Sequence, residues 1–215
     1  MNETSLTKRT KMLIILTGLS IAVLIISNLA STKITAVGPA VFDAGTILFP
    51  LAYIITDIVT EVYGVRIARW MVFVGLGTLV LMSVVLLIVQ HLPVGPGFDG
   101  QAAYERILGF VPRIAFASMT AYFVGEMLNI HLMAWLRKRF GANRLFIRLI
   151  GSSSTGELLD TLTFSTIAFA GTMTSHDFIQ LIMTVYLIKL GFDTILAPIS
   201  ARFIRWLKLT QAISA

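Results

Sequence analysis

The sequence predicts an all-α polytopic membrane protein, a bundle of six transmembrane helices with both termini in the cytoplasm. The 215 residues are 56% hydrophobic and only 13% charged, with a mean hydropathy of +0.85, whereas soluble domains carry about 25% charged residues. Six apolar stretches are each long enough to span hydrocarbon, which takes roughly 20 residues. Lys and Arg cluster between alternate stretches, as the positive-inside rule requires.

The six stretches form a single transmembrane domain over residues 1–215, with no separate soluble domain. They cover residues 12–30, 45–63, 70–90, 112–136, 146–171 and 178–207. The first stretch follows three basic residues, as in a signal peptide, but the later stretches already demand an inserted chain. Two outer connections are more than simple turns, because 31–44 can form a small hairpin and 102–108 a short helix.

The basic residues orient the bundle. Thirteen of the 17 Lys and Arg residues fall on one side of the six-span arrangement, three fall on the other, and Lys189 lies inside a span. The thirteen are Lys8, Arg9, Lys11, Arg66, Arg69, Arg137, Lys138, Arg139, Arg144, Arg148, Arg202, Arg205 and Lys208. This side therefore faces the cytoplasm. The sequence has no long basic tail that would bind nucleic acid, so the lipid bilayer is the expected partner.

Catalytic and metal-binding patterns are absent from the sequence. There is no cysteine, which excludes thiolate metal sites and cysteine nucleophiles. His91, His131 and His176 are scattered and do not form the closely spaced clusters of membrane metalloenzymes. We therefore expect no catalytic residues, no metal and no cofactor.

Several ionisable side chains lie within the expected spans, where a charge is costly unless it faces the bundle interior or water. They are Asp57 and Glu61 in the second span, Glu126 in the fourth, Glu157 and Asp160 in the fifth, and Lys189 and Asp193 in the sixth. Six carboxyl groups accompany one lysine, so some must be protonated, or be neutralised by a cation or by donors on a ligand. A site rich in acceptors suits a substrate that is rich in N–H donors or positively charged.

Structural roles stay open for some of these residues. Glu61 lies near the cytoplasmic end of its span and could pair with Arg66 or Arg69. Lys189 and Asp193 are four residues apart and could pair within one helix. Asn28, at the end of the first span, could hydrogen-bond another helix.

The second span contains the pattern Thr56-Asp57-x-x-x-Glu61-x-Tyr63-Gly64. It resembles the signature second span of the queuosine precursor transporters, also called the vitamin-uptake-transporter-like family. Matches of the same order and spacing occur in other spans: Ser27-Asn28, Tyr122 with Gly125-Glu126, Gly156-Glu157 with Asp160-Thr161, and Tyr186 with Lys189. The resemblance covers nearly the whole chain.

The resemblance implies a carrier in the inner (cytoplasmic) membrane that imports 7-cyano-7-deazaguanine or 7-aminomethyl-7-deazaguanine. A guanine-like edge presents an N1–H and a 2-amino group, two parallel donors that one carboxylate can accept. We expect Glu126 or Glu157 to accept the hydrogen bonds from this edge. The candidate substrate contacts are Asn28, Asp57, Tyr122, Glu126, Glu157, Asp160, Phe164 and Lys189, and the candidate coupling or gating residues are Glu61 and Asp193.

Three other kinds of membrane protein are the alternatives. The substrate-binding subunit of an energy-coupling-factor vitamin importer is also a small six-helix protein. A membrane-embedded enzyme is less favoured because the catalytic patterns are missing. A channel would need a wider pore, unless the protein forms a homo-oligomer. The preferred deazapurine and the source of energy stay open.

Overall fold

The computed structural model describes residues 8–38, 40–108, 111–141, 144–171 and 174–213. These residues form seven α-helices, a 3-10 turn and a two-stranded sheet. In chain order the elements are α1 (Lys8–Ala30), β1 (Ile34–Val37), β2 (Ala40–Asp43), η1 (Ala44–Ile47), α2 (Phe49–Tyr63), α3 (Val65–Gln90), α4 (Gln101–Leu108), α5 (Val111–Phe140), α6 (Leu145–Phe169) and α7 (Ser175–Ile213).

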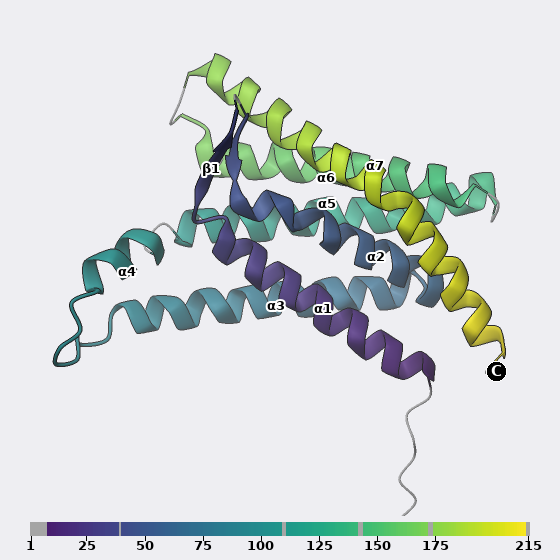
Figure 1. The fold of residues 1–215 in the computed structure, drawn as a ribbon, viewed down its shortest axis with the longest axis horizontal. Helices are drawn as coiled ribbons and strands as arrows, with labels where there is room; N and C mark the ends of the chain where they lie inside the picture. Colours follow the sequence, from purple (N-terminus) through teal and green to yellow (C-terminus); the bar gives the residue numbers. More distant parts are fainter. Residues whose placement is uncertain (1–7, 39, 109–110, 142–143, 172–173, 214–215) are drawn as a thin grey trace, which may run out of the picture.

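The long helices lie side by side as a bundle (Figure 1). The β-hairpin and α4 lie at one end of the bundle, whereas the start of α1 and the end of α7 lie at the other end. The helices α5 and α6 are joined by a short connection and make the most extensive helix–helix contact. The short helix α2 contacts α1, α3, α5, α6 and α7. It is therefore the centre of the bundle.

Among the described residues, four segments are apolar and long enough to cross a membrane. They are α1, the segment Ala44–Tyr63, α3 and Phe178–Leu209 within α7. With 30 and 25 residues, α5 and α6 exceed the length needed for a crossing. They carry more polar side chains and are not among these four. The chain is a multi-pass, all-α membrane protein, and the expected count of six crossings stays a prediction.

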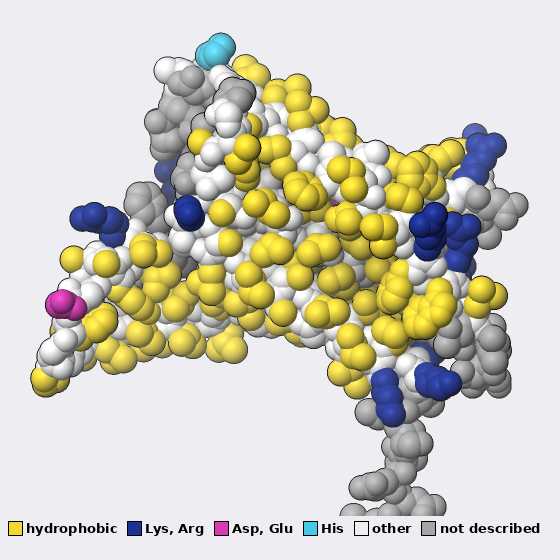
Figure 2. All heavy atoms as spheres, viewed as in Figure 1, with side chains coloured by type: hydrophobic (Ala, Val, Ile, Leu, Met, Phe, Trp, Pro, Cys, Tyr) yellow, Lys and Arg dark blue, Asp and Glu magenta, His cyan; other side chains and the backbone are white. Residues whose placement is uncertain are grey.

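The outer surface of the bundle is apolar. Large apolar side chains such as Leu81 of α3, Phe116 of α5 and Ile195 of α7 are more than half exposed. Hydrophobic side chains cover the middle of the face shown in Figure 2, and Lys and Arg gather mainly at the end where α1 begins and α7 ends. An apolar belt of this kind fits hydrocarbon rather than water.

The hairpin expected within 31–44 is confirmed. Strands β1 and β2 pair antiparallel, with Ile34 opposite Asp43 and Val37 opposite Ala40. Gly38 begins the connection with a φ of +59°, a backbone conformation that glycine adopts at no steric cost. The short helix expected at 102–108 is also present as α4.

Pro50 falls inside the second expected span but near the start of a helix. It lies in the first turn of α2, after η1, where a missing backbone N–H costs no helical hydrogen bond. The second span is thus a 3-10 turn followed by a 15-residue helix. In contrast, Pro198 does lie inside α7.

Two glycines bring α5 and α6 into close contact. A Cβ atom added to Gly156 would lie 2.9 Å from the carbonyl oxygen of Gly125 and 3.0 Å from both Asn129 Cβ and Tyr53 Cε1. A Cβ added to Gly125 would lie 2.9 Å from the carbonyl oxygen of Gly156. Only glycine allows the two backbones and the Tyr53 ring to share this space, a packing mode common between membrane helices.

We predict that Gly156→Ala lowers stability, because the added methyl group must displace backbone or a buried ring. The cost of such overpacking is about 1–3 kcal/mol, and it should appear as a lower midpoint of thermal unfolding in detergent. Gly77→Ala in α3 is the matched control, since a Cβ there meets nothing within 4 Å. Equal midpoints for the two variants would contradict the close contact.

Candidate substrate-binding site

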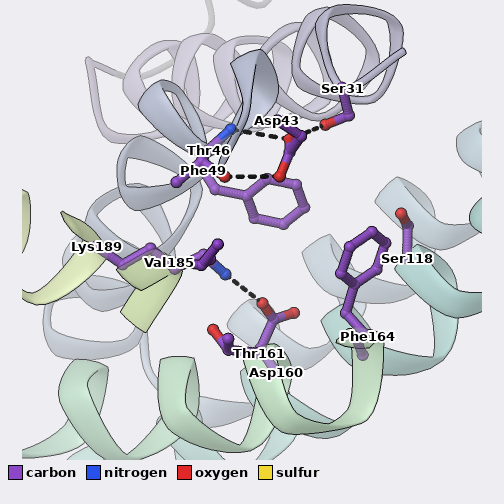
Figure 3. A pocket seen from close by; sticks show the side chains of 11 residues that line it. Ser31, Asp43, Thr46, Phe49, Ser118, Asp160, Thr161, Phe164, Val185 and Lys189 are labelled. Carbon is purple, nitrogen blue, oxygen red and sulfur yellow. Dashed lines mark hydrogen bonds and ion pairs between the residues drawn. The ribbon is translucent and has the colours of Figure 1, made fainter. Parts of the chain in front are cut away.

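A pocket lies between the hairpin end of the bundle and helices α5, α6 and α7 (Figure 3). It is lined by Ser31, Asp43, Thr46, Phe49, Ser118, Ala121, Asp160, Thr161, Phe164, Val185 and Lys189. The volume that the centre of a water molecule can occupy is about 20 Å³, enough for about one water. A larger ligand therefore requires the side chains that line this pocket to move.

One wall of the pocket is fixed by Asp43 at the end of β2. Its Oδ1 accepts hydrogen bonds from Ser31 Oγ at 2.5 Å and from the Thr46 backbone N–H at 3.2 Å. Its Oδ2 accepts a third from Thr46 Oγ1 at 2.7 Å. Asp43 is thereby the N-cap of η1 and ties the end of α1 to the start of the second span. Ser27 adds a bond to the Gly45 carbonyl oxygen at 2.9 Å.

The opposite wall carries an ion pair. Lys189 Nζ of α7 lies 2.6 Å from Asp160 Oδ2 of α6, and both side chains are almost fully buried. Asp160 Oδ1 and Thr161 Oγ1 have no hydrogen-bond partner among the described residues. The pocket therefore offers two acceptor atoms beside an ammonium group.

Aromatic rings complete the lining. Phe49, at the start of α2, and Phe164 of α6 both contribute their rings to the pocket wall (Figure 3). Lys189 Nζ lies 5.0 Å from the centre of the Phe49 ring, within range of a cation–π interaction. A planar ligand can stack on such rings while polar atoms fix its edge.

A second polar layer lies deeper, between α2, α5 and α6. Glu126 accepts hydrogen bonds from Thr56 Oγ1 at 3.0 Å and from Asn129 Nδ2 at 3.4 Å. Asp57 accepts hydrogen bonds from Asn129 Nδ2 at 2.9 Å and from Ser153 Oγ at 2.8 Å. All of these donors are uncharged, so the layer compensates its carboxyl groups by hydrogen bonding alone.

A cluster of charged side chains lies at the end of the bundle where α1 begins and α7 ends. Arg148 binds Glu61 with two nitrogens, at 2.8 Å and 3.3 Å, and its side chain is 1% exposed. Lys208 of α7 pairs with the same carboxylate, and Arg137 Nη1 of α5 lies 3.9 Å from Glu61 Oε1. Glu61 thus joins α2 to α5, α6 and α7. The expected partners Arg66 and Arg69 do not take part in the described ion pairs.

The structure sorts the candidate residues into groups. Asp160, Phe164 and Lys189 line the pocket. Five further candidates are buried but do not line the pocket: Asp57, Tyr122, Glu126, Glu157 and Asp193. Asn28 is half-buried and donates to Leu24 O of its own helix at 3.0 Å. The suggested pairing of Lys189 with Asp193 is replaced by the pairing with Asp160.

Sequence reasoning missed the hairpin side of the pocket and the partner of Glu61. Asp43 followed three residues later by Thr46 is a capping pattern, and it could have marked this turn as ordered. From the sequence, Arg148 is interpreted only as a charge that sets the orientation of the bundle in the membrane. In the described part of the chain, no group of three or more His, Cys, Asp or Glu side chains is arranged to hold a metal ion.

We predict that Arg148→Met destabilises the protein by up to about 3 kcal/mol, because it removes one partner of a buried ion pair. The readout is the thermal unfolding midpoint in detergent. Arg202→Met on the exposed surface of α7 is the control and should unfold like the unmodified protein. If Arg148→Met has the same unfolding midpoint as the unmodified protein, Lys208 alone is sufficient to neutralise Glu61.

Comparisons with known proteins agree with the membrane architecture. Residues 43–203 match the model of the family described as "Putative vitamin uptake transporter". The chain is 28% identical over 173 residues to a "Probable queuosine precursor transporter" of Bacillus subtilis, covering 80% of this chain and 76% of the relative. It is 30% identical over 172 residues to a Haemophilus influenzae protein of the same name, covering 76% and 71%.

A third relative is the "Queuosine precursor transporter" of Escherichia coli, with 31% identity over 125 residues, 58% of this chain and 54% of the relative. No solved structure matches the chain. The family match spans about three quarters of the chain, and it includes α2, α3, α5, α6 and most of α7. The chain belongs to this family of vitamin-uptake-type membrane transporters.

Proposed function

We propose that this protein is a six-crossing carrier of the cytoplasmic membrane that imports queuosine precursors, the bases 7-cyano-7-deazaguanine and 7-aminomethyl-7-deazaguanine. The observation that carries the proposal is the pocket that combines aromatic rings with the Asp160–Lys189 pair. Relatives named for transport of queuosine precursors support the choice of substrate class. Lys and Arg at the end of the bundle shared by the described termini support a cytoplasmic orientation of that end.

The pocket matches the edge of a guanine-like base. Such an edge carries a 6-oxo acceptor beside an N1–H and a 2-amino group. Lys189 can donate to the 6-oxo group, while the free Oδ1 of Asp160 can accept from the neighbouring N–H donors. The rings of Phe49 and Phe164 can stack on the planar base.

The deeper layer extends this site. Because the pocket holds about one water, a base must displace side chains and so approach the groups behind them. Glu126 lies in that layer with its carboxyl held by Thr56 and Asn129. We propose that Glu126 receives the amino groups of the substrate once the pocket opens, with Tyr122 and Asp57 lining the path.

We predict that Asp160→Asn weakens binding of 7-cyano-7-deazaguanine roughly 10- to 100-fold, because a hydrogen bond to a charged group contributes about 1.5–3 kcal/mol. Binding to the purified protein and uptake of the labelled base by cells measure the effect. Asp99→Asn in the exposed loop before α4 is the matched control and should bind normally. Unchanged binding by Asp160→Asn would remove this residue from the site.

We predict that Phe164→Ala reduces affinity about 5- to 100-fold, as expected when a stacking contact of about 1–3 kcal/mol is lost. Phe116→Ala on the exposed face of α5 is the control, and its affinity should equal that of the unmodified protein. Both affinities can be measured by titration calorimetry in detergent.

A ligand screen tests the substrate class as a whole. The purified protein is assayed by thermal shift against deazaguanines, guanine and common vitamins, and only the deazaguanines and close purines should stabilise it. Stabilisation by a vitamin and by no deazapurine would refute the proposed function. Uptake into liposomes that contain this protein alone would exclude the requirement for an ATPase partner.

A further inference from the structure

Two of the buried carboxylates are balanced by cations. Glu61 is paired with Arg148 and Lys208, and Asp160 is paired with Lys189. Each of these pairs holds two opposite charges in contact, which is the arrangement that makes burial of an ionised group tolerable. These carboxylates are therefore the fixed charges of the bundle.

Glu157 and Asp193 have no such partner. Their side chains are buried, and neither oxygen of either carboxyl group has a hydrogen-bond partner among the described residues. An isolated buried carboxylate is so costly that the group is neutralised instead. Since each carboxyl also lies in a helix within the bundle, a bound proton is the simplest way to remove its charge.

The two groups influence each other. Glu157 precedes Asp160 on α6 by three residues and Asp193 follows Lys189 on α7 by four, and these two helices run in opposite directions, so both carboxyl groups lie on the same side of the Asp160–Lys189 contact. Two neighbouring carboxylates in an apolar interior cannot both be ionised, so they titrate as one unit. The other titratable groups that act on one or both of them lie on four helices: Tyr53 and Asp57 on α2, Glu126 on α5, Asp160 on α6, and Tyr186 and Lys189 on α7.

Lys189 connects this pair to the pocket. It lies one turn before Asp193 on α7, yet its ammonium group lies on Asp160 at 2.6 Å. If Glu157 and Asp193 were ionised, they would compete with Asp160 for the single cation. The observed position of Lys189 is the one expected when the pair is neutral.

We propose that Glu157 and Asp193 form a proton-binding site that couples substrate import to an inward proton gradient, with Lys189 as the link to the pocket. When Glu157 and Asp193 are protonated, Lys189 stays paired with Asp160. Lys189 then offers the hydrogen-bond donor, and Asp160 the acceptor, that the substrate base requires. Loss of the proton to the cytoplasm draws Lys189 toward the pair and dismantles that arrangement. Proton and substrate therefore favour each other's binding, which is the condition for symport.

This proposal rests on the proposed function, and reconstituted protein tests both. Liposomes containing the protein are given labelled 7-cyano-7-deazaguanine, with and without an inward gradient of one pH unit. One proton per base supports about tenfold accumulation in that gradient. Asp193→Asn cannot exchange a proton, so its accumulation should fall to the level without a gradient, while exchange of labelled for unlabelled base continues.

Asp99→Asn is the control for loss of a carboxylate and should respond to the gradient as the unmodified protein does. Exchange without any response to the pH gradient in the unmodified protein would refute the proton site and leave the proposed function intact. A response to a sodium gradient instead would refute it equally. Absence of both binding and exchange for every deazapurine would refute the proposed function.

A second measurement does not depend on transport. The infrared spectrum of the protein at neutral pH should contain the carbonyl stretch of a protonated carboxyl group. Glu157→Gln and Asp193→Asn should each diminish this band, and Glu105→Gln on the exposed surface of α4 should not. An unchanged band in both pair variants would show that neither residue holds the proton. Circular dichroism and gel filtration establish that the variants are folded.

Discussion

The close contact of α5 and α6 at Gly125 and Gly156 determines where the polar groups of this bundle lie. Each of the two glycines is followed directly by a glutamate, so the point where the backbones approach most closely also fixes the starting positions of both carboxyl groups. Tyr53 of α2 packs against the same point. A bulkier residue at either glycine would separate the helices and with them the layer of groups that faces α2 and α7.

The carboxyl groups of this bundle differ in the partners that surround them. Glu61, at one end, is surrounded by cations. Asp57, one turn away on the same helix, receives only uncharged donors from Asn129 and Ser153. Glu157 receives neither from the part of the chain that the structure describes. Ion pairs thus surround Glu61, whereas Asp57 and Glu157 have no cation within ion-pair distance among the described residues.

Apolar length and charge distribution were sufficient to predict the helices, because a helix that faces lipid must be long and apolar whatever it packs against. The position of charged groups within the spans singled out Asp160 and Lys189, and the resemblance to a transporter family added Phe164; all three line one pocket. The sequence alone does not determine which carboxylate pairs with Lys189. Asp193 lies four residues later on the same helix and Asp160 lies on another helix, and only the packing of α6 against α7 distinguishes them. Arg148 was misjudged for the same reason, because only packing brings it to Glu61, 87 residues earlier in the chain.

The ion cluster around Glu61 also bears on how the protein is made. Synthesis proceeds from the N-terminus, and the residues that neutralise Glu61 come 87 and 147 residues later. A chain that ends before α6 holds this carboxylate without either cation, and one that ends before the last turns of α7 still lacks Lys208. The set of cations around Glu61 is therefore complete only once the last helix has been made.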